Sequence, residues 1–195
     1  MNKKIGLFGG SFDPIHSAHL ILASVLKSEF DLDTVFFIPN FSSPFKEGKT
    51  FTDIRHRIEM IRLAITENDG FILSDFEARQ NRPVFTYETV EYFRSEFPEA
   101  SLSLIIGWDS LMSFKKWKNY QYIVSNTELL VAGRNCGSEN SLLEGLPYRH
   151  SRYYPDSGVS STLLREMVSN NINIKYLVND EVQRYIIQKK LYCKT

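Results

Sequence analysis

The chain has 195 residues, a length that fits one domain over residues 1–195 with a sizeable hydrophobic core. Its 23 Lys and Arg residues balance 23 Asp and Glu residues, which argues against a protein that binds nucleic acid through a broad basic surface. No apolar run approaches the roughly 20 residues that a helix needs to span a bilayer, so we expect no membrane partner.

Short apolar runs alternate with helical patterns in the first half of the chain. Residues 4–8 predict a buried first strand, and apolar residues at helical spacing predict a helix over 17–30. A second strand is predicted over 34–38, stopped by Pro39. After it we expect a polar loop over 40–49, a helix from about 52, a short strand over 71–73, a charged loop over 77–85 and a helix over 86–97.

The helix from about residue 52 is predicted from its isoleucines. They form a stripe at helical spacing, and Asp53 falls in the first turn, where a negative charge suits the helix dipole. His56 is expected on the solvated face. The isoleucines of the stripe are Ile54, Ile58, Ile61 and Ile65.

The second half repeats the alternation. Strands are predicted over 102–106, 128–132 and about 149–154, and helices over 160–170 and from about 179, with a loop over 133–145. Strands that alternate with helices predict an α/β fold with a mainly parallel sheet. Ligands of such sheets bind at the carboxyl ends of the strands.

The most informative segment is residues 9–19, Gly-Gly-Ser-Phe-Asp-Pro-Ile-His-Ser-Ala-His, which joins the first strand to the first helix. Gly9 and Gly10 let the backbone approach a phosphate, and the free N–H groups of the following helical turn point at it. His16 and His19 lie three residues apart, on one face, so both can reach the same ligand. The segment therefore predicts a site for a nucleotide phosphate.

Two common phosphate motifs are missing from the sequence. It contains no G-x-x-x-x-G-K-[ST] and no G-x-G-x-x-G after the first strand, which excludes a P-loop and the dinucleotide-binding fingerprint. Phosphate chemistry would then depend on the histidines and on basic residues from elsewhere in the chain.

Two motifs carry a resemblance to a known family. Residues 9–19 resemble G-G-[ST]-F-D-P-[IV]-H-x-G-H of the nucleotidyltransferase superfamily, with Ala18 at the family's glycine. Residues 159–165, Val-Ser-Ser-Thr-Leu-Leu-Arg, resemble [IV]-S-S-T-x-[IL]-R, about 140 residues further on. Within the superfamily the chain is most similar to bacterial nicotinate-nucleotide adenylyltransferases.

The resemblance implies a fold and a reaction. The fold is a Rossmann-like open parallel sheet with helices on both faces, in which a C-terminal helical element over about 158–195 carries the second motif. The reaction joins ATP and nicotinate mononucleotide into deamido-NAD and pyrophosphate, with Mg²⁺ bound to ATP and no metal site on the protein. We expect a cytoplasmic protein, because no signal peptide is visible and Cys136 and Cys193 show no metal-ligand spacing.

The ATP site is assigned from both motifs. Hydroxyls and N–H groups at a helix start hold anions, and an arginine one turn in can reach the same phosphates. Arg134 follows the strand over 128–132 and could also face pyrophosphate. The resemblance implies further roles in the site for Gly107, Asp109 and Lys46. The predicted catalytic residues are His16, His19, Lys46 and Arg165. The predicted ATP contacts are Gly9, Gly10, Ser11, Phe12, His16, His19, Gly107, Asp109, Arg134, Ser160, Ser161, Thr162 and Arg165.

The mononucleotide site is assigned mostly by resemblance. Trp117 is implied to stack on the pyridine ring, and the backbone N–H near Thr86 is implied to meet the nicotinate carboxylate. Asn40 follows a strand and is a candidate contact on that ground alone. The predicted substrate contacts are Ser11, Asn40, Lys46, Thr86 and Trp117.

The sequence leaves several alternatives open. A sister enzyme could use nicotinamide mononucleotide or phosphopantetheine as acceptor, or transfer a cytidylyl group, and an inactive nucleotide-binding sensor could keep the same fold. A class I aminoacyl-tRNA synthetase is disfavoured, because the chain is short and carries no basic excess. Whether the protein forms a homo-oligomer is also open.

Overall fold

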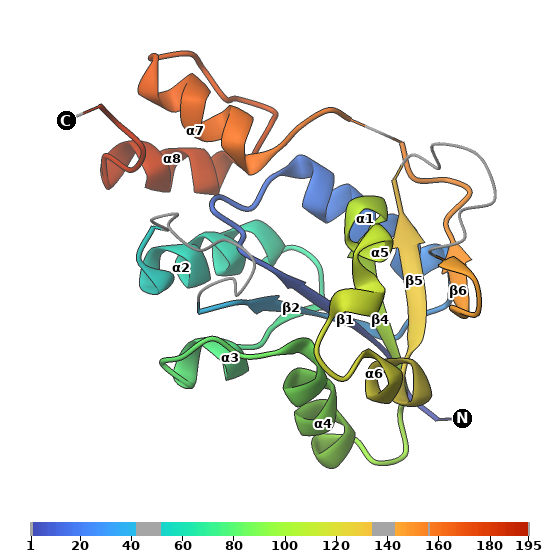
Figure 1. Ribbon diagram of the computed structural model, residues 1–195. Coiled ribbons are helices and arrows are strands. Elements are labelled where there is room, and N and C mark those ends of the chain that lie inside the picture. The colour runs from blue at the N-terminus through green and yellow to red at the C-terminus, as the bar shows by residue number, and fades with distance from the viewer. Residues whose placement is uncertain (1, 42–51, 134–142, 156, 195) are drawn as a thin grey trace.

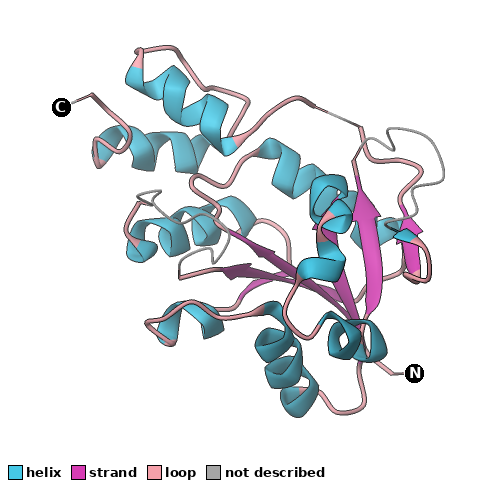
Figure 2. Ribbon diagram, in the orientation of Figure 1, coloured by secondary structure: helices cyan, strands magenta, loops and turns pink. Residues whose placement is uncertain are grey.

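The computed structural model describes residues 2–41, 52–133, 143–155 and 157–194. The strands are β1 (Lys4–Gly10), β2 (Thr34–Pro39), β3 (Phe71–Leu73), β4 (Ser101–Gly107), β5 (Glu128–Ala132) and β6 (Tyr148–His150). The helices are α1 (Ser17–Glu29), α2 (Ile54–Ile65), α3 (Phe76–Arg79), α4 (Thr86–Glu96), α5 (Trp108–Met112), α6 (Tyr120–Asn126), α7 (Ser161–Ser169) and α8 (Asp180–Gln188), with a 3-10 turn η1 (Phe114–Lys116). Figure 2 shows how helices enclose the strands.

The strands form one parallel sheet in the order β3-β2-β1-β4-β5-β6. Successive residues of a strand point to opposite faces, and both faces of this sheet are apolar. In β1, for example, Phe8 packs into the cluster on one face, whereas Ile5 and Leu7 pack into the cluster on the other. The predicted Rossmann-like fold, with helices on both faces, is confirmed.

Each apolar cluster is closed by its own set of helices. Buried residues of α1, α2, α7 and α8 complete the first cluster, and buried residues of α4, α5 and α6 complete the second. Figure 1 shows α2, α7 and α8 on one side of the strands and α4 and α6 on the other. Because the C-terminal helices α7 and α8 belong to the first cluster, the second motif is brought to the side of the sheet that carries α1.

Helix α2 differs from its prediction. It begins at Ile54 with Asp53 as its N-cap, and the Asp53 side chain accepts a hydrogen bond from the Arg55 N–H. Ile54 and Ile58 are only half-buried, and the buried face consists of Arg57, Met60, Ile61 and Ile65. The predicted stripe is therefore rotated, because a buried arginine takes a place that periodicity assigned to isoleucine.

Other boundaries also differ. The segment between β4 and β5, for which no helix was predicted, contains α5, η1 and α6, and the charged segment after β3 begins with the short helix α3. The last strand covers only Tyr148–His150. Short helices bury few apolar residues, so their periodicity in the sequence is weak.

The order of the strands determines where a ligand can bind. From β1 the chain adds β2 and β3 on one side, and it then crosses to the other side of β1 and adds β4, β5 and β6. The point between β1 and β4, where the direction of addition reverses, is the switch point of the sheet. The carboxyl ends of β1 and β4 therefore flank the switch point, the position at which open α/β sheets bind their ligands. Among the described residues, no helix has both the length and the apolar character needed to cross a membrane.

Candidate active site

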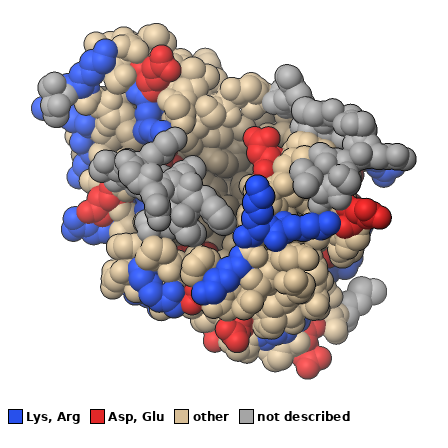
Figure 3. Space-filling view, in the orientation of Figure 1, with Lys and Arg blue, Asp and Glu red and all other residues tan. Residues whose placement is uncertain are grey.

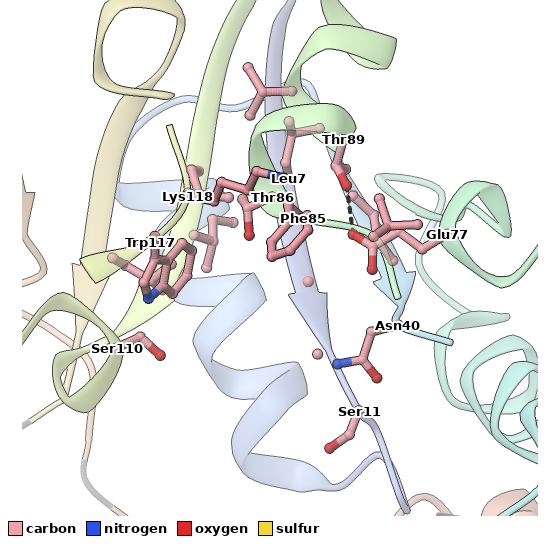
Figure 4. A pocket seen from close by; sticks show the side chains of 18 of the residues that line it. Leu7, Ser11, Asn40, Glu77, Phe85, Thr86, Thr89, Ser110, Trp117 and Lys118 are labelled. Carbon is pink, nitrogen blue, oxygen red and sulfur yellow. Dashed lines mark hydrogen bonds between the residues drawn. The ribbon is translucent and has the colours of Figure 1, made fainter. Parts of the chain in front are cut away.

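A pocket of about 370 Å³ opens at the carboxyl ends of β1, β2 and β4. Figure 3 shows the hollow near the centre of this face. In Figure 4, Trp117 and Ser110 lie on one side of the cavity and Asn40 and Ser11 on the other, with Phe85 and Thr86 between them. The structure brings the following predicted site residues to its wall: Gly9, Gly10, Ser11, Asn40, Thr86, Asp109 and Trp117.

The glycines at these strand ends leave room beside the backbone. A Cβ atom added at Gly9 or Gly107 would meet no atom within 4 Å, so open space lies over both neighbouring strand ends. A Cβ at Gly10 would lie 3.0 Å from the ring of Phe12. That ring is buried, and Phe12 has a φ of 46°, a conformation uncommon outside glycine. The predicted ATP contact Phe12 thus has its side chain in the core, where it supports the loop.

The two histidines stack on each other at the start of α1. Their ring centroids are 3.7 Å apart, with 26° between the planes. The backbone N–H of His16 donates to Nδ1 of His19 at 3.2 Å. A neutral imidazole has one donor and one acceptor nitrogen, so the proton of His19 is on Nε2. His19 therefore presents an N–H donor away from the backbone of the loop.

Both rings are held in the neutral state. His16 is 5 % exposed, and burial lowers its pKa to about 4. Burial also lowers the pKa of His19 well below its usual value, and the neighbouring His16 lowers it further. Among the described residues, Nδ1 of His16 is buried and has no hydrogen-bond partner. A buried polar atom of this kind is normally satisfied by a ligand or water.

The second motif docks on the first. Arg165 Nη1 donates to the carbonyl of Asp13 at 2.7 Å, and Ser161 Oγ donates to the carbonyl of Pro14 at 3.0 Å. Ser160 is the N-cap of α7, with its Oγ accepting from the Leu163 N–H at 3.2 Å. The two motifs, distant in the sequence, therefore share one loop. Helix α1 begins where this loop ends, and the first residue of α7, Ser161, contacts the loop at Pro14.

The sequence did not indicate that Arg57 would support this loop. Arg57 is 1 % exposed, and its Nη1 donates to the carbonyls of Ser11 at 2.9 Å and Asn40 at 2.8 Å. It also donates to the carbonyls of Thr52 at 3.0 Å and Phe41 at 3.1 Å. Arg57 thus ties the segments after β1 and β2 together. One signal in the sequence could have indicated that Arg57 is buried: it lies four residues before Ile61 and therefore on the same face of the helix.

Asn40 presents a second unsatisfied atom. Its backbone N–H donates to the carbonyl of Gly10 at 3.0 Å, which fixes it beside the end of β1. Its Oδ1 is buried without a hydrogen-bond partner among the described residues, and the residue lines the pocket. Like Nδ1 of His16, this atom is available to a bound molecule.

The far wall of the pocket is formed by α4 and by the segment after α5. Thr86 is the first residue of α4, whose first N–H groups have no acceptor inside the helix. Trp117 follows η1 and packs on Phe114, with 5.0 Å between ring centroids. Asp109 lies exposed in the first turn of α5, where Gly107 takes the cap position. An aromatic face and a helix N-terminus thus meet in one cavity.

Glu77 is a further pocket residue that the sequence did not indicate. It is 7 % exposed, and Thr89 Oγ1 donates to its Oε1 at 2.6 Å (Figure 4). Burial raises the pKa of Glu77 to about 7, and the Thr89 hydrogen bond partly opposes that rise. A carboxyl group therefore lines the cavity in a form that is largely protonated below neutral pH.

The remaining histidines lie away from the pocket wall. His56, predicted on the solvated face, is half-buried, and its Nδ1 is 2.8 Å from the hydroxyl of Tyr185 in α8. That prediction was wrong because α8 covers this side of α2. Nε2 of His150 is 2.9 Å from the carbonyl of Gly133.

Two predicted residues, Lys46 and Arg134, lie outside the described residues. Within the part of the chain that is described, no three His, Cys, Asp or Glu residues gather in a way that could hold a metal ion.

Comparison with known proteins agrees with this geometry. Residues 7–167 match the family model for cytidylyltransferase-like proteins. The chain is 36 % identical over 191 residues to a probable nicotinate-nucleotide adenylyltransferase of Cytophaga hutchinsonii, covering 97 % of this chain and 98 % of the relative. It is 34 % identical over 190 residues to a probable nicotinate-nucleotide adenylyltransferase of Bacillus licheniformis, with the same coverage.

Solved structures show the same fold. A nicotinic acid mononucleotide adenylyltransferase of Plasmodium falciparum, complexed with NaAD, superposes with a TM-score of 0.82 at 20 % identity over 98 % of both chains. A putative nicotinate-nucleotide adenylyltransferase of Vibrio parahaemolyticus gives 0.72 at 21 % identity over 99 % of this chain and 97 % of that chain. With the family model covering most of its length and both motifs joined at one loop, the chain belongs to the cytidylyltransferase-like family, among the nicotinate-nucleotide adenylyltransferases.

Proposed function

We propose that the protein transfers the adenylyl group of ATP to nicotinate mononucleotide, giving deamido-NAD and pyrophosphate. The observation that carries the proposal is the junction of the two motifs, in which Arg165 Nη1 donates to the Asp13 carbonyl at 2.7 Å, beside a pocket with an aromatic wall. Two relatives at 36 % and 34 % identity are named as probable enzymes of this reaction, which supports the assignment.

The reaction is a direct displacement at phosphorus. A phosphate oxygen of the mononucleotide attacks the α-phosphorus of ATP, and the bond from that phosphorus to the bridging oxygen breaks, so that pyrophosphate leaves with the electron pair. Phosphoryl transfers of this kind need positioning and charge stabilisation more than covalent help from the protein. No covalent enzyme intermediate is part of the proposal.

The histidine pair is proposed to stabilise the charge that develops on the phosphates. In a neutral His19, Nε2–H is a donor, and its direction is fixed by the Nδ1 contact with the His16 N–H at 3.2 Å. A preorganised donor of this type contributes about 3–4 kcal/mol to transition-state stabilisation in other enzymes. We propose that the N-terminus of α7, with Ser160, Ser161, Thr162 and Arg165, holds the triphosphate, because helix N-termini and guanidinium groups favour phosphate.

The pyridine half of the substrate is proposed to occupy the described pocket. An indole face suits a cationic pyridinium ring, so Trp117 is proposed to stack on it. The N–H groups at the start of α4, near Thr86, are proposed to meet the nicotinate carboxylate, and Asn40 and Ser11 to contact the mononucleotide. Asp109 and Gly107 are proposed to meet the ribose of ATP, with Lys46 and Arg134 as further phosphate contacts.

Mg²⁺ is proposed to arrive with ATP. The described residues offer no cluster of three metal-ligating side chains, and Mg²⁺ commonly binds through the phosphates of its substrate. The ion would neutralise part of the triphosphate charge when bound. The protein's own part is to orient the phosphates around it.

The test is a panel of acceptors with product detection by mass. The protein is incubated with Mg-ATP and, separately, with nicotinate mononucleotide, nicotinamide mononucleotide and phosphopantetheine. Deamido-NAD as the dominant product is the expected result. Pyrophosphate release only with another acceptor would overturn the proposed substrate, and nucleotide binding without turnover would indicate an inactive sensor.

A further inference from the structure

The charged side chains on the pocket wall are few. Glu77 is buried and largely protonated below its pKa of about 7, and Asp109 is exposed on α5. The only cation among the described lining residues is Lys118, which directly follows Trp117. Figure 3 shows Lys and Arg side chains beside the hollow, over the region of α5 and α6. A substrate anion in this pocket therefore has one described lysine from which to obtain a counter-charge.

Lys118 extends its ammonium group over the start of α4. Its Nζ lies 4.3 Å from the centroid of the Phe85 ring and 5.8 Å from that of the Tyr87 ring. Phe85 caps α4 and Tyr87 is its second residue, so the ammonium is held beside the residue between them, Thr86. Figure 4 shows the Lys118 side chain reaching across the top of the pocket toward Thr86 and Phe85. The positive charge and the helix N-terminus thus converge on one place.

The charge of Lys118 is only partly balanced by the groups around it. Within the described residues Lys118 forms no ion pair, and Glu88, whose pKa it helps to lower, is already bound to Arg82 with Nη2 2.6 Å from Oε1. Exposed cation–π contacts such as those with Phe85 and Tyr87 are weak, so the ammonium can turn toward a ligand at little cost. These contacts hold it in place without neutralising it.

We propose that Lys118 is a specificity-determining residue, whose ammonium group attracts the carboxylate on the pyridine ring and thereby sets the preference for the acid over the amide. The inference rests on the proposed function. A carboxylate and a carboxamide have similar shapes, and helix N–H groups can donate to an oxygen of either. A nearby cation distinguishes them, because it attracts the carboxylate and repels the pyridinium ring of the amide, whose charge no carboxylate compensates.

The test compares the two mononucleotides in three variants. Lys118→Met removes the charge, Lys118→Arg keeps it, and Lys116→Met is the matched control, since Lys116 is exposed and is not part of the described pocket wall. The ratio of kcat/KM for nicotinate over nicotinamide mononucleotide is measured at saturating Mg-ATP. Lys118→Met is expected to lower the ratio about tenfold, the size of effect that one partly solvated charge exerts. Lys118→Arg should stay within about threefold of the wild type, and Lys116→Met should leave the ratio unchanged.

Two results would overturn the inference. An equal loss of kcat/KM with both mononucleotides in Lys118→Met would mean that the side chain only supports the aromatic wall. Unchanged kcat/KM values with both mononucleotides would mean that Lys118 has no part in binding or selection. Wild-type protein that makes no deamido-NAD would instead refute the proposed reaction. Affinities for the two mononucleotides, measured by calorimetry without ATP, separate a failure of the proposed reaction from a failure of the role of Lys118. If the wild type binds the acid more tightly than the amide and Lys118→Met loses that preference, the role of Lys118 is supported even when no deamido-NAD is made.

Discussion

Replacing Glu77 by Gln is expected to stabilise the protein above neutral pH. Burial raises the pKa of Glu77 from 4.5 to about 7 in the folded protein. A carboxyl with a raised pKa favours the fold while it is protonated, so its contribution is complete below about pH 4.5 and is lost as the pH rises through about 7. Gln is close to the protonated carboxyl in shape and can still accept the hydrogen bond from Thr89 through its amide oxygen.

The size of the effect follows from the two pKa values. The difference between 4.5 and about 7 corresponds to about 3 kcal/mol of free energy of unfolding once the pH exceeds the higher value. The advantage of Glu77→Gln over the wild type should therefore grow by about 2–3 kcal/mol between pH 5 and pH 8.5. All other titrating groups are present in both proteins, so their contribution to the free energy of unfolding cancels in the difference.

Urea denaturation at a series of pH values measures this difference directly. Equal slopes of the free energy of unfolding against urea concentration would show that the two proteins expose the same amount of surface on unfolding. Glu91→Gln, at an exposed position of the same α4 helix that carries Thr89, is the matched control and should change the free energy by less than about 0.5 kcal/mol at every pH. A difference between Glu77→Gln and the wild type that stays constant from pH 5 to pH 8.5 would refute the reasoning.

Three further predictions concern the loop that joins the motifs. His19→Ala should lower kcat/KM about 100-fold or more, by loss of one oriented donor, whereas His56→Ala should not, and turnover of His19→Ala within twofold of the wild type would contradict the assignment. Arg57→Met should lower the free energy of unfolding in urea by about 3 kcal/mol or more, because buried carbonyls lose their donor, and the exposed Arg62→Met serves as control. Because burial lowers the pKa of His16 to about 4, the contribution of its neutral ring to the free energy of unfolding should be complete above pH 6.5 and fall by about 3 kcal/mol toward pH 4. His16→Asn should reduce this loss of stability in acid. The same loss in His16→Asn and in the wild type would contradict the prediction.

Much of the fold was accessible without coordinates. Apolar runs bounded by Gly or Pro marked the central strands, and helical periodicity marked α1 and α4, because burial on one face leaves a local trace in the sequence. The segment between β4 and β5 left no such trace: α5, η1 and α6 are short and present few buried residues. The rotated face of α2 escaped prediction because Arg57 is buried by hydrogen bonds to carbonyls that lie far away in the chain.

The sequence by itself determined the alternation of strands and helices, the glycine-histidine turn and the family, since each depends on residues that are neighbours along the chain. Only the tertiary structure decided that Arg165 reaches Asp13, that the rings of His16 and His19 stack in the neutral state, and that Glu77 and Lys118 face the same cavity. The physical reason is that desolvation and charge pairing depend on every group packed around a side chain, and most of those groups come from distant segments.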